Sequence, residues 1–163
     1  MPPTFVRFAT VLALATLSTS TLFAAGAVTE SAHLVVSGGS NAGTYDKTTD
    51  RGGCSAGLAG HGSFGNQLSD PKDKDPKHFN SLQLIVPDPK KPHDFLLKVG
   101  FGPLMHRGAE YVVETRAGQK KSGSGAATVL DKGATAVVNF DATTAEGVRL
   151  SGTIDCRSVL RAP

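Results

Sequence analysis

Short runs in which apolar and polar residues alternate recur along this chain. In the clearest run, residues 95–101, every second residue is a large apolar one. A side-chain period of two is typical of a strand with one buried face. No stretch carries apolar residues at helical spacing for several turns, so the pattern predicts an all-β protein. Strands are expected at 33–37, 54–64, 79–86, 95–101, 111–115, 126–130, 134–141 and 148–156.

Glycine, proline and short polar residues separate these runs. The stretch 38–53 is polar and rich in glycine, and it predicts a flexible segment rather than a core element. The charged stretch 70–77 and the proline-rich stretch 87–92 predict loops, because proline cannot donate to a ladder of hydrogen bonds. One strand is ambiguous: residues 109–117 also fit a short helix, although β-branched and aromatic side chains favour a strand.

Seven to eight short strands with glycine-rich connections predict a single-domain antiparallel β-sandwich, with a flattened barrel as the alternative. Within this domain, 28–53 holds the first strand and the flexible segment, and 54–163 forms the body of the sandwich. The alternation does not indicate a hollow interior of ligand size, which favours the sandwich.

The first 27 residues resemble a secretion signal. Arg7 gives a short basic start, residues 8–23 are apolar or small and uncharged, and Ala25-Gly26-Ala27 suits signal peptidase. The apolar run is short for a membrane span, which needs about 20 residues. We therefore expect cleavage before Val28, a secreted or periplasmic protein of bacterial type, and no membrane span after cleavage.

The two cysteines, Cys54 and Cys156, are predicted to form a structural disulfide. Exported thiols tend to oxidise, and neither cysteine lies in a CxxC pair. Cys156 shares its parity with Leu150 and Ile154, which places it on the apolar face of a strand. We expect the bond to join the second strand to the last one and to close the body of the sandwich.

The charge of the chain is small. Loss of residues 1–27 removes one basic residue from 17 Lys+Arg and none from 14 Asp+Glu, which leaves a net charge of +2. Such a weak excess argues against a nucleic-acid-binding protein, which carries a clustered basic face. The basic doublets Lys90-Lys91 and Lys120-Lys121 lie beside turn residues and are interpreted as solvated loop tips rather than a phosphate site.

The five histidines stand alone in the sequence. Metal sites usually draw two ligands from a tight local motif, so no metal and no cofactor are expected. The alternative is a small periplasmic copper- or zinc-binding protein that uses His106, Met105 and His61. Calcium at Asp70, Asp73 and Asp75 is disfavoured, because lysines alternate with these acids and no glutamate follows to complete the ligand shell.

No motif for a nucleophile elbow, a nucleotide loop or a zinc protease is present. A dispersed triad remains open, because its members meet only in space, and Ser63, His61 and Asp94 are the candidates. We expect a protein that is not an enzyme.

One loop is the candidate contact surface. Glycine and proline frame Leu104, Met105, His106 and Arg107, and loops on rigid scaffolds often carry recognition. The same apolar residues can instead cap one end of the core, which is the favoured interpretation of the loop. The sequence thus predicts an exported, non-catalytic binding or structural protein whose partner is an envelope or extracellular protein or a glycan. A weaker alternative is a secreted hydrolase inhibitor that acts through residues 70–78.

Overall fold

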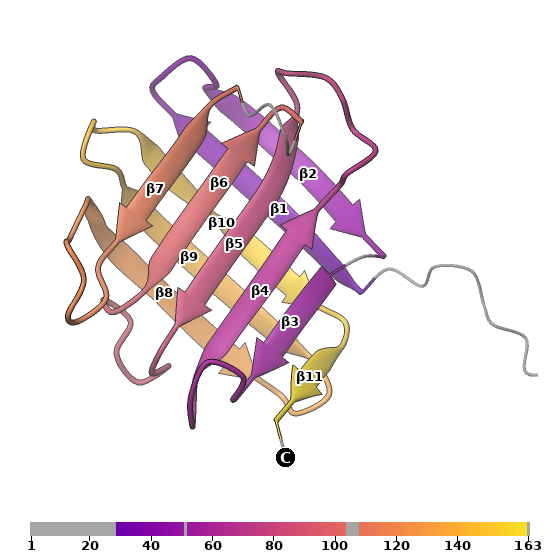
Figure 1. Cartoon of the computed structure of the whole chain (residues 1–163), viewed down its shortest axis with the longest axis vertical. Coiled ribbons are helices and arrows are strands. Elements are labelled where there is room, and N and C mark those ends of the chain that lie inside the picture. Colours follow the sequence, from indigo (N-terminus) through magenta and orange to yellow (C-terminus); the bar gives the residue numbers. More distant parts are fainter. Residues whose placement is uncertain (1–28, 51, 104–107, 163) are drawn as a thin grey trace, which may run out of the picture.

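Figure 1 shows the computed structural model of the chain, which describes residues 29–50, 52–103 and 108–162. In these residues the chain forms eleven strands and no helix. The strands are β1 (Glu30–Ser37), β2 (Gly43–Thr49), β3 (Gly52–Ala56), β4 (Phe64–Ser69), β5 (Phe79–Val86), β6 (Leu96–Phe101), β7 (Glu110–Glu114), β8 (Ser124–Asp131), β9 (Ala136–Thr143), β10 (Arg149–Cys156) and β11 (Val159–Arg161).

The strands form two sheets that pack face to face. One has five strands in the order β2-β1-β10-β9-β8, and the other has six in the order β11-β3-β4-β5-β6-β7. Neighbours are antiparallel except β11, which runs parallel to β3. The strands of one sheet cross those of the other at a steep angle (Figure 1). The predicted all-β sandwich is confirmed.

The core lies between the two sheets, where the alternating pattern places it. In β1 the side chains of Ala32, Leu34 and Val36 are buried, and the residues between them are more exposed. Phe95 and Phe101 at the two ends of the 95–101 run are fully buried. The ambiguous segment around residue 112 is a strand, β7, which pairs with β6 along five residues.

Three differences raise the strand number above the expected seven to eight. The expected strand 54–64 is two strands, β3 and β4, because the chain turns at 57–63 and leaves Leu58 exposed. The segment expected to be flexible contains β2, whose outward side chains are polar. The short β11 follows β10, so Cys156 is not in the last strand, and Cys54 lies in the third strand rather than the second.

Candidate functional site

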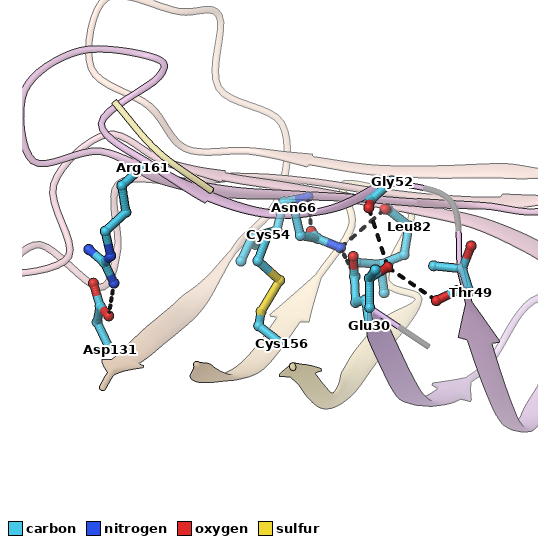
Figure 2. Close-up of a disulfide and its surroundings, with 11 residues drawn as sticks. Glu30, Thr49, Gly52, Cys54, Asn66, Leu82, Asp131, Cys156 and Arg161 are labelled. Carbon is cyan, nitrogen blue, oxygen red and sulfur yellow. Dashed lines mark hydrogen bonds and ion pairs between the residues drawn. A yellow bond between two sulfur atoms is a disulfide. The ribbon is translucent and has the colours of Figure 1, made fainter. Parts of the chain in front are cut away.

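The predicted disulfide joins the two sheets. Cys54 of β3 and Cys156 of β10 are bonded, with their Cα atoms 5.8 Å apart and a sequence separation of 102 positions. Both are buried. Figure 2 shows the bond spanning the gap between the sheets. This prediction is confirmed.

A polar pair, which the sequence pattern did not predict, lies beside the disulfide. Glu30 is the cross-strand neighbour of Cys156, and Asn66 is that of Cys54. The Asn66 side-chain amide donates a hydrogen bond to Oε1 of Glu30 (Figure 2). Asn66 Oδ1 also accepts from the backbone N–H of Leu84 at 2.7 Å. A covalent tie and a hydrogen-bonded tie therefore cross between the sheets side by side.

Glu30 is fully buried, and its Oε2 has no hydrogen-bond partner among the described residues. Burial raises the pKa of its carboxyl from 4.5 to about 7, while the hydrogen bond from Asn66 acts in the opposite direction. The signal for this position was its parity: Glu30 falls in the same alternation as the buried Ala32 and Leu34 of β1.

The aspartate-rich loop 70–78 is held by a lysine from outside it. Lys47 of β2 places its Nζ 3.2 Å from Asp70 and 3.0 Å from Asp73. Partial burial acts to raise the pKa of Asp73, but hydrogen bonds from Lys47, the backbone of Asp75 and His78 outweigh it and lower the pKa. The charge compensation expected within the loop thus comes largely from β2. A hydrolase-inhibiting role for this loop stays a prediction.

The loop predicted to contact a partner, Leu104, Met105, His106 and Arg107, lies outside the described residues. Its base is held beside the aspartate-rich loop. The backbone N–H of Gly102 donates to the carbonyl of His78 at 2.9 Å, and the Asn80 side-chain amide donates to the carbonyl of Gly102 at 2.8 Å.

The structure does not bring the candidate triad together. Ser63 is buried and accepts a hydrogen bond from the backbone of Ala59, whereas Asp94 accepts one from the backbone of Ala117. Another histidine, His33, makes a 2.7 Å contact with Asp46 across β1 and β2.

Metal ligands do not gather in the described part of the chain, where no group of three or more His, Cys, Asp or Glu side chains is placed to hold an ion. His61 is exposed in the turn between β3 and β4, and its suggested partners Met105 and His106 are not described. The metal-binding alternative therefore stays a prediction.

An open groove lies between the β5–β6 loop and the β7–β8 loop, which are neighbours in Figure 1. Two adjoining hollows of about 620 and 390 Å³ share His93, Thr115 and Lys121. Lys91 borders the smaller hollow, and Asp141 of β9 borders the larger one. We call this feature the lysine groove.

Backbone and side-chain hydrogen bonds fix both banks of the lysine groove. The carbonyl of Pro92 accepts from the N–H of Ala127 at 2.8 Å, which lays the first loop along the edge of β8. His93 Nδ1 contacts the carbonyl of Gly125 at 2.7 Å. Across the groove, the Asp94 carboxylate accepts from the N–H of Ala117 at 2.8 Å and ties the two loops together.

The lysines in and beside the lysine groove make few ion pairs. Lys90, Lys120 and Lys121 are exposed and pair with no carboxylate of the described residues, and Lys91 lies 3.8 Å from Asp88. The nearby acids are engaged elsewhere: Glu114 holds Arg116 in a two-point contact at 2.7 and 2.9 Å. The two doublets interpreted as separate loop tips are exposed loop residues, but the fold brings one lysine of each, Lys91 and Lys121, to one groove.

Comparison of the chain with protein-family models, with curated proteins and with solved structures found no match. Within the described residues, no helix has the length and apolar character needed to cross a membrane.

Proposed function

We propose that this chain is an exported, non-catalytic binding protein that holds its ligand in the lysine groove. The observation that carries the proposal is the meeting of Lys91 and Lys121, thirty positions apart in sequence, on two loops that the fold fastens together. Loops that are positioned by a rigid sandwich are the usual place for recognition. Lys121 has no carboxylate partner among the described residues, and the exposed Lys91 has only a 3.8 Å contact with Asp88, so both ammonium groups are available to a ligand.

Export is the second part of the proposal. The leader-like residues 1–27 support it, with cleavage before Val28, and so does the disulfide between Cys54 and Cys156, since such bonds persist in oxidising compartments. The place of action is then the cell envelope of a bacterium or its surroundings.

The test is retention on the envelope of the producing cell. We expect Lys91→Glu/Lys121→Glu to move the protein from the envelope fraction to the free fraction by about tenfold or more. This figure takes about 1 kcal/mol for each lysine near an anionic surface. Quantitative immunoblotting of both fractions gives the ratio, and thermal unfolding checks that the variant is folded.

The chain offers a matched control for net charge. Lys72→Glu/Lys77→Glu makes the same charge change on exposed residues of the 70–78 loop. Its distribution should equal that of the wild type. The same distribution for all three proteins would contradict the proposal, and equal loss from both variants would reduce the effect to net charge.

A further inference from the structure

We infer that the ligand of the lysine groove is an anionic polysaccharide, whose charged groups are carboxylates or phosphates. This inference rests on the proposed function and names its ligand class. The kind of cation in the lysine groove supports this ligand class. Arg116, the arginine of these loops, is bound to Glu114, so the cations left to a ligand are lysine ammonium groups on exposed stems, of which Lys91 makes one 3.8 Å contact with Asp88. Lysines act as mobile point charges and suit anionic groups that repeat along a flexible chain.

The shape of the lysine groove suits a chain molecule. Its two hollows adjoin at His93, Thr115 and Lys121, so the groove continues past these residues from Lys91 to Asp141. Lys91 and Lys121 both border the smaller hollow, and the larger hollow continues from it along Ser124 and Ala126 to Asp141. An anionic group held by the two lysines fills only the smaller hollow, whereas a chain molecule extends into both.

The side chains that line the lysine groove also favour a sugar chain over a nucleic acid. The lining residues include Pro92, Ala117, Ala126 and two glycines, and the one aromatic ring among the residues that line either hollow is the imidazole of His93, whose Nδ1 contacts the carbonyl of Gly125. Proteins that bind single-stranded nucleic acids stack bases on aromatic side chains. A saturated sugar chain needs no such platform, and the exposed Ser124 can hydrogen-bond its hydroxyl groups. The lining residues therefore favour a polysaccharide over a nucleic acid.

Two carboxylates, those of Asp94 and Asp141, line the groove. Acids without a partner would repel an anionic ligand, so their contacts matter. Arg149 holds Asp141 in a two-point contact at 2.9 and 2.6 Å, and the hydrogen bond and charge of Arg149 lower the pKa of Asp141. Asp94 accepts from the backbone of Ala117. Arg149 therefore compensates the charge of Asp141, and the single charge of Asp94 is outnumbered by those of Lys91 and Lys121 on the same hollow.

The experiment measures binding of the full mature chain to defined polymers. The probes are polygalacturonate for carboxylate, phosphomannan for phosphate, neutral mannan, and a single-stranded DNA oligonucleotide of similar charge. We expect one or both anionic polysaccharides to bind more tightly than mannan and DNA, and affinity to fall as salt rises. Whichever of the two binds identifies the anionic group.

The lysine variants assign that binding to the groove. Lys91→Ala/Lys121→Ala should weaken binding by about tenfold or more and reduce the dependence of log Kd on log salt by about 1 to 2. Lys72→Ala/Lys77→Ala, the matched control, should change Kd by less than about twofold. Equal weakening in both variants would overturn the inference.

The remaining outcomes separate this inference from the proposed function. If no anionic polysaccharide binds while Lys91→Glu/Lys121→Glu still leaves the envelope, the ligand class is wrong and the binding role stands. If DNA binds more tightly than either polysaccharide, the groove belongs to a nucleic acid. If envelope retention does not change in that variant, the proposed function fails first.

Discussion

At the scale of single residues, the carboxyl of Glu30 is unusual because it is buried in the core with one oxygen lacking a partner among the described residues. It is fully buried beside the disulfide, with one oxygen bonded to Asn66 and the other unpartnered among the described residues. A buried charge that lacks a partner is costly, so the group takes up a proton more readily than in water. The raised pKa couples the stability of the sandwich to pH.

The direction of this coupling follows from the two states. Between pH 4.5 and about 7 the folded chain keeps the proton on Glu30 and the unfolded chain has lost it. The free energy of unfolding should therefore fall as pH rises through this window, by about 3 kcal/mol in total. Glu30→Gln has no such proton, so its stability should not show this loss. Urea unfolding at a series of pH values measures both slopes.

A surface substitution provides the control for that measurement. Glu146→Gln, in the exposed turn between β9 and β10, should keep the wild-type slope. The carboxyls with lowered pKa, such as Asp131 and Asp141, weaken the fold only when pH falls toward or below their ordinary 3.8. A Glu30→Gln variant with the full wild-type slope would show that another group is responsible.

At the scale of elements, the start of β8 depends on a close approach to β9. Gly123 has a φ of +85°, and a Cβ atom there would lie 2.3 Å from the carbonyl oxygen of Thr143. Gly147 has nearly the same φ, +83°, but nothing within 4 Å of its Cβ position. The two glycines therefore separate backbone strain from backbone contact.

Alanine at these two glycine positions should lower the free energy of unfolding by different amounts. Gly147→Ala should lower the free energy of unfolding by about 1 kcal/mol, the strain of a left-handed residue. Gly123→Ala should lower it by at least about 2 kcal/mol more, because a backbone carbonyl cannot move aside cheaply. Urea unfolding of both variants gives the difference. Equal losses would mean that β8 shifts freely on β9 and that this bank of the lysine groove is not fixed.

Several strands could be predicted from the sequence, because the pattern that indicates them is local. The expected strand 79–86 coincides with β5, and 95–101 contains β6. Alternation succeeded there because one face of each strand meets the core. It failed at β2, where Thr44, Asp46 and Thr48 face outward and the backbone ladder with β1 defines the strand.

At the scale of the whole molecule, the disulfide closes a loop of 102 residues and joins the two sheets. In the chain-entropy model a closed loop of about 100 residues contributes about 4.7 kcal/mol. Cys54→Ala/Cys156→Ala should therefore lower the free energy of unfolding by about 4 kcal/mol, measured by urea unfolding at pH 5, where Glu30 is protonated. Reduction of the wild-type protein should give a similar loss. A loss below about 1 kcal/mol in both would show that native packing, rather than the covalent bond, restricts the chain.

The sequence alone determined the class of the protein. Its alternation indicated two-faced strands, and its turn residues separated them. The parity of Cys156 indicated a buried half-cystine. These features follow from short-range geometry, because a strand exposes every second residue to the same side. They were therefore visible without knowledge of which strands are neighbours.

The tertiary structure alone decided the polar pair at the disulfide and the lysine groove. Glu30 meets Asn66, and Lys91 comes near Lys121, only because the strands that carry them are ordered in particular ways within the sheets. Strand order depends on long-range pairing, which a single sequence does not record in its local pattern. For this reason the two isolated lysine doublets looked incidental, although the fold brings one lysine of each, Lys91 and Lys121, to one groove.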